Sequence, residues 1–134
     1  MSIFYTNNID KTQPEKLKRF FVGWPNKPDL ETHFKILKNS FAVWIALDGD
    51  RCVGFINAIS DKIFYSFIPL LEVLPEYQGR GIGTELLNRM IDTLDKMYAI
   101  DIVCDDSISE FYQSKGFRRS SGMVKRNYLH QSGK

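Results

Sequence analysis

The most informative segment of the sequence is Leu74-Pro75-Glu76-Tyr77-Gln78-Gly79-Arg80-Gly81-Ile82-Gly83. It follows Ile63–Leu74, which is rich in strand-forming residues and interrupted by Pro69, where we expect a bulge or an open edge. It leads into residues 83–97, where apolar side chains recur with the 3.6-residue period of a helix. These side chains are Leu86, Leu87, Met90, Ile91 and Leu94. The sequence therefore predicts a strand, a glycine-rich turn and an amphipathic helix, in that order.

A turn of this composition has a physical use. The first N–H groups of a helix lack intrahelical acceptors, and the helix dipole adds positive charge there. Glycines let a diphosphate approach the backbone, so the corner predicts an anion site, although glycines can also serve merely to make a tight turn. Two nucleotide-binding loops are excluded, because Gly83 is followed by Thr84 and Glu85 rather than Lys-Ser/Thr, and the glycines are spaced Gly-x-Gly-x-Gly.

The remaining pattern predicts an α+β fold with a mixed sheet. We expect a strand, two helices, three strands, a helix, a strand, a helix and two final strands. The first two helices would begin at a capping box, Thr12–Glu15, and at Asp29 as N-cap. A further capping box at Ser107 would begin the last helix, which Gly116 would end. The other strands are expected at 3–6, 41–47, 52–59, 98–104, 117–121 and 123–128.

Length and composition narrow the class of protein. The 134 residues fit one domain, 1–134, with a loose tail at 130–134. The net charge of +2, with mixed signs along the chain, argues against nucleic-acid binding. Because no secretory signal pattern and no apolar run of membrane-spanning length occurs, we expect a cytoplasmic protein without a membrane partner. Cys52 and Cys104 have no metal-ligand spacing, so we expect reduced thiols and no metal site.

Three features together resemble the Gcn5-related N-acetyltransferase (GNAT) family. The stretch Gln78-Gly79-Arg80-Gly81-Ile82-Gly83 matches the family signature Gln/Arg-x-x-Gly-x-Gly/Ala. Its lead-in, Leu71–Tyr77, and the motif Phe111-Tyr112-Gln113-Ser114-Lys115-Gly116-Phe117 look like the family's fourth strand and its Phe-Tyr-x-x-x-Gly-Phe segment. These motifs cover 71–84 and 105–117, and the expected order of elements extends the resemblance over the whole chain.

The resemblance implies the GNAT fold, with a splay between strands 63–74 and 98–104, and acetyl-CoA as co-substrate. In this family the coenzyme A pyrophosphate lies on backbone amides of the loop, and pantetheine pairs with the fourth strand. The amide of Leu71 would polarise the thioester carbonyl, and the Arg80 guanidinium would either contact phosphate or remain solvated. Mapped here, the implied cofactor-binding residues are Val73, Gln78, Gly79, Arg80, Gly81, Ile82, Gly83 and Thr84, with the backbone of Leu71.

Side-chain roles follow from the same resemblance. Tyr112 is the candidate general acid that protonates the leaving thiolate, the alternative being packing alone. Glu72 is the only acid of the fourth strand. It is either the general base or a structural or cofactor-side hydrogen-bonding residue, since alternation points it away from Leu71 and Val73 unless a bulge intervenes. Asp105 stands where many relatives have Asn, and Trp24 would line the acceptor pocket or plug the core.

The sequence leaves the acceptor open. We expect an N-acetyltransferase acting on a primary amine of a small molecule or a protein, and a monomer or homodimer. The alternative is a non-catalytic acyl-CoA-binding sensor or regulatory module. The two histidines, His33 and His130, are expected to be structural.

Overall fold

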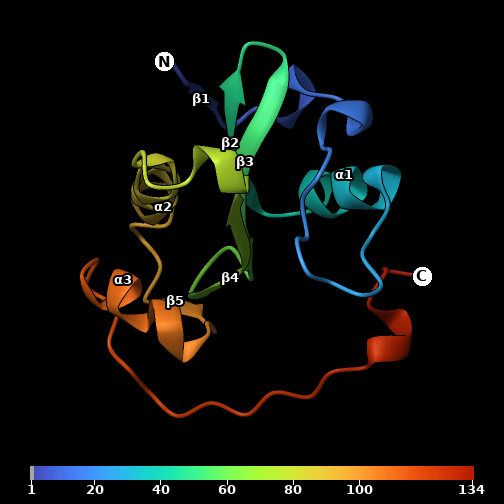
Figure 1. Cartoon of the computed structure of the whole chain (residues 1–134). Helices are drawn as coiled ribbons and strands as arrows, with labels where there is room; N and C mark the ends of the chain where they lie inside the picture. Colours follow the sequence, from blue (N-terminus) through green and yellow to red (C-terminus); the bar gives the residue numbers. More distant parts are fainter. Residues whose placement is uncertain (1) are drawn as a thin grey trace.

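A computed structural model describes residues 2–134 and contains one mixed five-stranded sheet (Figure 1). Its strands lie in the order of the chain, and neighbours from β1 to β4 are antiparallel. The last strand, β5, runs parallel to β4 after a crossover through a helix. The bounds are β1 Phe4–Thr6, β2 Ala42–Asp48, β3 Arg51–Ser60, β4 Tyr65–Val73 and β5 Ala99–Ile102. The predicted mixed α+β class is confirmed.

Helices cover both faces of this sheet (Figure 1). They are α1 Leu30–Lys38, α2 Ile82–Thr93 and α3 Ser109–Gln113. Asp29 caps α1 as predicted, because its carboxylate accepts the Thr32 N–H at 2.8 Å. On the other face, α2 packs so closely on β3 that a Cβ at Gly54 would lie 3.1 Å from Leu86 Cδ1.

A bulge in β4 lies at the predicted position. Asn57 of β3 faces Leu70, but Ile59, two residues later, faces Phe67, so β4 holds one extra residue next to Pro69. Proline has no N–H to donate to the ladder. Beyond the bulge, the Leu70 N–H donates to the Asn57 side-chain oxygen at 3.1 Å, which keeps β3 and β4 joined.

The predicted helix after Thr12 does not form. The segment contains two short 3₁₀ turns, Ile9–Lys11 and Pro14–Lys16, and Thr12 ends the first turn instead of beginning a helix. Left-handed φ angles at Arg19 (73°) and Phe21 (60°) break any helical continuation. Leu17, Phe20 and Phe21 are nevertheless buried, because an irregular path brings all three into the core.

The second predicted capping box is also wrong. A 3₁₀ turn, Asp106–Ile108, precedes α3, so Ser107 lies inside that turn and caps nothing. The helix end is as predicted: Gly116 adopts φ 94°, and the Phe117 N–H donates back to the Tyr112 carbonyl at 3.1 Å. The strand at 98–104 is confirmed in shorter form as β5.

The two strands predicted at 117–121 and 123–128 are absent. Residues 118–127, here called the C-terminal arm, are extended and exposed, and swing away from the sheet (Figure 1). A 3₁₀ turn, Tyr128–His130, follows. The tail that was expected to be loose then contacts the body, where the Asn26 N–H donates to the Gln131 side chain at 3.2 Å and Lys134 Nζ pairs with Asp29 at 2.7 Å.

A buried histidine should make the stability of the protein depend on pH. His33 lies among the rings of Phe20, Phe21 and Phe55, and burial lowers its pKa from 6.5 to about 4. The unfolded chain therefore binds one more proton than the folded chain between these two values, and the free energy of unfolding should fall as the pH is lowered through this window. We expect a loss of up to about 3 kcal/mol at pH ~4 relative to pH 7 in urea unfolding.

The variant His33→Leu isolates this effect, because it removes the titrating ring and leaves the exposed carboxylates unchanged. Its free energy of unfolding should fall by less than that of the wild type between pH 6.5 and 4. Identical pH profiles for the two proteins would contradict the assignment.

Candidate functional site

The glycine loop precedes α2 and leaves the N-terminus of this helix open. Gly79 and Gly81 adopt φ 76° and 83°, and a Cβ built on either would meet nothing within 4 Å. Gly81 is the N-cap of α2, and its carbonyl accepts the Glu85 N–H at 3.0 Å. The N–H groups of Ile82, Gly83 and Thr84 therefore precede the first intrahelical bond and lie at the positive end of the helix dipole.

The edge of β4 next to this loop is also open. Within residues 2–134, β5 pairs with Tyr65–Ile68 only, so the two strands part at the Pro69 bulge. The Leu74 N–H donates to Val53 on β3, and antiparallel alternation then directs the N–H groups of Leu71 and Val73 away from β3. The splay predicted between these strands is therefore present, with backbone groups of β4 along its edge.

Val73 joins the strand edge to the glycine loop. Its carbonyl accepts the Gln78 side-chain amide at 3.0 Å. Its side chain faces α2, because a Cβ at Gly83 would lie 3.7 Å from Val73 Cγ2. The loop backbone and the open edge of β4 thus form one continuous surface.

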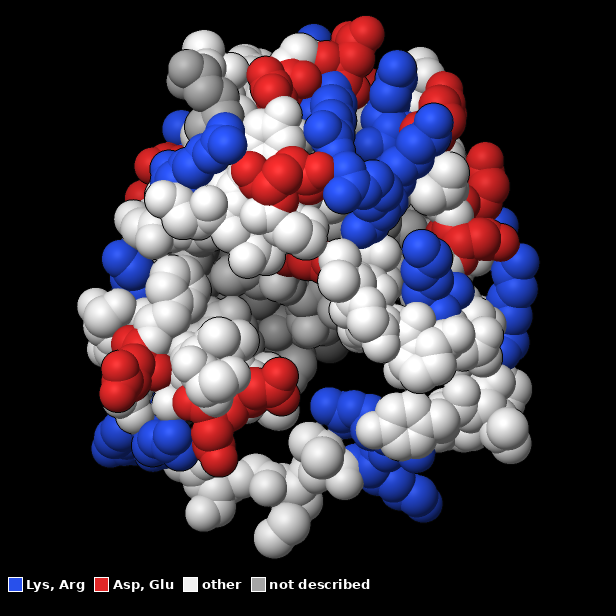
Figure 2. Space-filling view, viewed as in Figure 1, with Lys and Arg blue, Asp and Glu red and all other residues white. Residues whose placement is uncertain are grey.

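Basic side chains surround the loop. The guanidinium groups of Arg51 and Arg80 lie 5.5 Å and 5.2 Å from the centre of the Tyr77 ring. Arg19 and Arg51 both pair with Glu76. The space-filling view shows Lys and Arg side chains gathered on the upper part of this face (Figure 2). Positive charge of this kind favours an anionic ligand at the loop. Sequence reasoning missed Arg19, Arg51 and Tyr77, because no local pattern signals that residues so far apart converge.

Glu72 lies on the opposite face of the sheet from the side chains of Leu71 and Val73. Its carboxylate accepts the N–H groups of Phe21 (2.9 Å) and Val22 (3.3 Å). Burial raises the pKa of this carboxyl, and the two N–H donors partly offset the shift. Glu72 therefore holds the turn in which Phe21 has a left-handed backbone, and the Phe21 ring contacts Trp24 with centroids 4.8 Å apart. Trp24 itself is 40% exposed, so it does not plug the core.

Tyr112 lies on α3, beside the strand that parts from β4. Its side chain is 6% exposed and packs edge-on against Phe111 and Phe117. Burial, with a smaller contribution from Cys104, raises the pKa of the phenol to about 12. The hydroxyl therefore carries its proton at neutral pH. The structure does not bring Tyr112 and Glu72 into one cluster, because they belong to different layers.

The other candidate residues have simpler surroundings. Asp105 precedes the turn Asp106–Ile108, and its side chain makes no capping bond there. His33 is buried, and His130 Nδ1 lies 2.7 Å from the Lys134 carbonyl oxygen. Cys52 and Cys104 are free thiols. Among residues 2–134 no group of three or more metal-ligating side chains occurs, and no helix there is long and apolar enough to cross a membrane.

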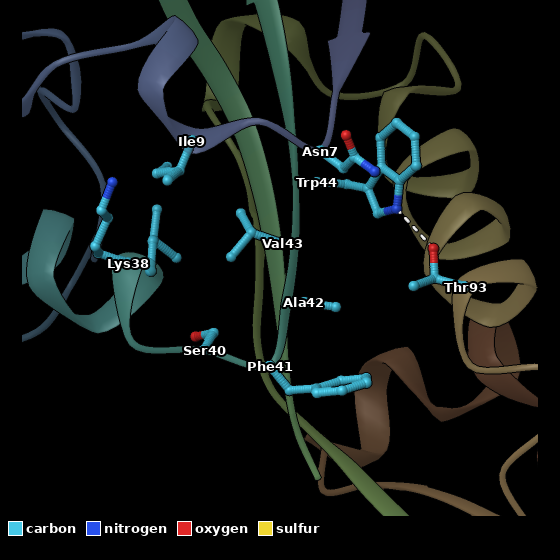
Figure 3. A pocket seen from close by; sticks show the side chains of 10 residues that line it. Asn7, Ile9, Lys38, Ser40, Phe41, Ala42, Val43, Trp44 and Thr93 are labelled. Carbon is cyan, nitrogen blue, oxygen red and sulfur yellow. Dashed lines mark hydrogen bonds between the residues drawn. The ribbon is translucent and has the colours of Figure 1, made fainter. Parts of the chain in front are cut away.

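A separate hollow lies away from the glycine loop. A cavity of about 270 Å³ lies at the edge of β2, beyond the end of β1 (Figure 3). Its lining includes Val43, Trp44 and Thr93, and Trp44 Nε1 donates to Thr93 Oγ1 at 2.9 Å. No residue of the glycine loop or of the β4 edge borders it. The features of an anion site lie at the glycine loop and the edge of β4, and not at this hollow.

Comparison with known proteins identifies the class. The family model for the acetyltransferase (GNAT) domain matches residues 39–119. A crystal structure of an acetyltransferase from Deinococcus radiodurans R1 superposes with a TM-score of 0.94 at 36% identity, covering 97% of this chain and 92% of that one. This chain belongs to the GNAT acetyltransferase family.

Two curated relatives agree. The histone acetyltransferase TAP1 of Glycine max is 32% identical over 78% of this chain and 50% of its own length. The uncharacterized N-acetyltransferase ycf52 of Porphyra purpurea is 27% identical over 90% of this chain and 71% of its own. The chain spans about half the length of the first of these. Both relatives agree with membership of the GNAT acetyltransferase family.

The Glu72 contacts predict a structural cost. Glu72→Gln keeps the shape of the side chain but leaves one oxygen acceptor for the N–H groups of Phe21 and Val22. It also removes the negative charge from both hydrogen bonds. We expect the free energy of unfolding to fall by about 1–2 kcal/mol in urea titration. Glu15→Gln, at an exposed position, is the matched control and should change stability little. Equal stability of wild type and Glu72→Gln would show that these two bonds contribute nothing.

Proposed function

We propose that the chain transfers the acetyl group of acetyl-CoA to a primary amine of a small molecule or a protein. One observation carries the proposal: the open N-terminus of α2 adjoins the free edge of β4, so a phosphate-bearing ligand can lie on the loop while its arm runs along the strand. The remaining chemistry follows from which groups line this path.

The loop and the strand would hold the donor. The N–H groups of Ile82, Gly83 and Thr84 receive the pyrophosphate, with Gly79, Arg80 and Gly81 forming the approach, and Gln78 fixes the Val73 carbonyl. The N–H of Leu71, directed into the splay, donates to the thioester oxygen and stabilises the charge that develops on it. Acetyl-CoA supplies the activated acyl group.

Proton transfer would involve the side chains. The attacking amine nitrogen bonds to the carbonyl carbon, the carbon–sulfur bond breaks, and the thiolate takes the phenolic proton of Tyr112. The raised pKa makes this phenol a weaker acid, so the transfer depends on its hydroxyl lying close to the sulfur. The amine must lose a proton to water or to Glu72. The raised pKa of Glu72 suits it to this role, although its carboxylate already holds the turn beside Trp24.

Coenzyme A should therefore stabilise the protein against heat. A ligand present at ~100 times its dissociation constant adds about 2.7 kcal/mol. Gly83→Leu should remove the stabilisation, because the side chain would extend into the path between Val73 and α2. Gly83→Ala is the matched control, since its Cβ makes only an ordinary contact and Gly83 has no left-handed φ. No thermal shift for wild type at millimolar coenzyme A would contradict the proposal.

A thiol-release screen of amines with acetyl-CoA then separates enzyme from sensor. Thiol release that depends on an acceptor amine supports the transferase. Coenzyme A binding without release for any amine supports the alternative, a non-catalytic acyl-CoA-binding module.

Tyr112→Phe tests the proton donor. The variant removes the hydroxyl and preserves the ring contacts with Phe111 and Phe117. The single-turnover rate should fall by ~100-fold or more with nearly unchanged affinity for coenzyme A. A wild-type rate would remove Tyr112 from the chemistry and leave the Leu71 amide as the main catalytic group.

A further inference from the structure

Tyr77 lies at the centre of a cluster of charged side chains beside the glycine loop. The guanidinium groups of Arg51 and Arg80 lie over its ring, at 5.5 Å and 5.2 Å from the ring centre. Its hydroxyl donates to the Asp48 carboxylate. Asp48 ends β2 and Arg51 begins β3, whereas Arg80 belongs to the glycine loop itself. One aromatic side chain therefore joins the β2–β3 hairpin to the loop.

The cluster has an excess of positive charge. Arg19 and Arg51 both pair with the Glu76 carboxylate. With Arg80, three guanidinium groups stand against the two carboxylates of Asp48 and Glu76. All three arginines are exposed, and Figure 2 shows Lys and Arg side chains gathered on the upper part of this face. An anion can therefore reach this cluster from solvent.

The Tyr77 ring supports Arg80. Arg80 is flanked by Gly79 and Gly81, which both have left-handed φ angles and face open space. Because glycine restricts the backbone least, the loop does little by itself to fix the direction of the Arg80 side chain. An aromatic ring attracts a guanidinium group to its face and orients its plane. We therefore regard the Tyr77 ring as the surface that orients this arginine.

The ring itself is anchored to the sheet. The Tyr77 hydroxyl donates to Asp48, the last residue of β2. This hydrogen bond raises the pKa of the phenol, so the hydroxyl keeps its proton and donates at neutral pH. A residue held by a strand positions its neighbours more precisely than one held by a loop. The contacts of Tyr77 thus connect a rigid strand to two cationic groups beside the glycine loop.

The proposed donor has two separate anionic parts. Its pyrophosphate would lie on the N–H groups of Ile82, Gly83 and Thr84, which form one helix terminus. Coenzyme A carries one further phosphate, on its ribose, away from the pyrophosphate. A guanidinium group can donate two parallel hydrogen bonds to the oxygens of a phosphate. A cationic cluster next to the helix terminus therefore fits this second phosphate.

We propose that Arg51 and Arg80 form a second phosphate subsite, which binds the ribose phosphate of the acyl donor, and that Tyr77 is the positioning residue that holds them there. The subsite selects donors that carry this phosphate, so acetyl-CoA is preferred to its dephospho form. The inference rests on the proposed function, because it requires the pyrophosphate to lie on the glycine loop.

Calorimetric titration with coenzyme A and with dephospho-coenzyme A tests the subsite. The wild type should bind coenzyme A at least ~10-fold more tightly, because the dephospho form lacks the group that accepts these charge-assisted hydrogen bonds. Arg51→Gln removes one cation and should lower this affinity ratio at least ~3-fold. Arg118→Gln is the matched control, because Arg118 is exposed on the C-terminal arm, and it should keep the wild-type ratio.

Two variants of Tyr77 test its positioning role. Tyr77→Leu keeps an apolar side chain but removes the aromatic face, so it should lower the affinity ratio at least ~3-fold. Tyr77→Phe keeps the ring under both guanidinium groups and loses only the hydrogen bond to Asp48, so it should restore most of the ratio. A purely structural role of Tyr77 would weaken the binding of both ligands equally and leave their ratio unchanged.

The outcomes separate this subsite from the proposed function. Equal affinity of the wild type for the two ligands overturns the subsite and leaves the donor site at the glycine loop intact. Failure of the wild type to bind either ligand overturns both. An unchanged ratio in Arg51→Gln also overturns the subsite, and this exposed substitution keeps the test decisive even if Tyr77→Leu does not fold. An unchanged ratio in a folded Tyr77→Leu overturns the role of Tyr77.

Discussion

The separation of β5 from β4 at the Pro69 bulge creates the open edge at which the candidate site lies. The extra residue beside Pro69 shifts the register of β4, and beyond that point β5 no longer follows it. A sheet normally pairs its backbone groups on both sides, and groups left open inside it must find other partners. Here the open groups at Leu71 and Val73 face the end of a helix that also leaves its first N–H groups free. Two sets of unpaired backbone donors therefore face one space.

Each surrounding element can be understood by how it keeps that space open. The Gln78 side chain takes the Val73 carbonyl, which fixes the loop against the strand without filling the splay. Gly54 lets α2 pack so closely on β3 that its N-terminus reaches the β4 edge. Tyr77 carries two guanidinium groups over its ring, and its hydroxyl donates to Asp48, so the positive charge is held beside the loop instead of being scattered.

The two faces of β4 have different roles. The side chains of Leu71 and Val73 face α2, whereas Glu72 reaches the irregular segment before α1 and holds the left-handed turn at Phe21. That segment replaces an expected helix, and its irregularity has a physical cause: the half-buried carboxylate of Glu72 needs N–H donors, and a regular helix would keep them in its own ladder. This left-handed turn also places Trp24 at the surface.

Features that depend on local spacing could be predicted from the amino-acid sequence. The 3.6-residue period predicted α2, and the glycines indicated its open N-terminal end. The capping residue Asp29 predicted where α1 begins, and the missing N–H of Pro69 predicted the bulge in β4. Features that depend on residues far apart in the chain could not be predicted in this way. Thr12 and Ser107 fit a local capping pattern but cap no helix. Left-handed residues follow Thr12, and a 3₁₀ turn contains Ser107, so no α-helix begins at either residue. The arm fits a strand pattern but pairs with no strand within residues 2–134, and strand pairing, unlike a helix, cannot be completed within one segment. The convergence of Arg19, Arg51 and Tyr77 likewise required the fold, since no short spacing brings them together.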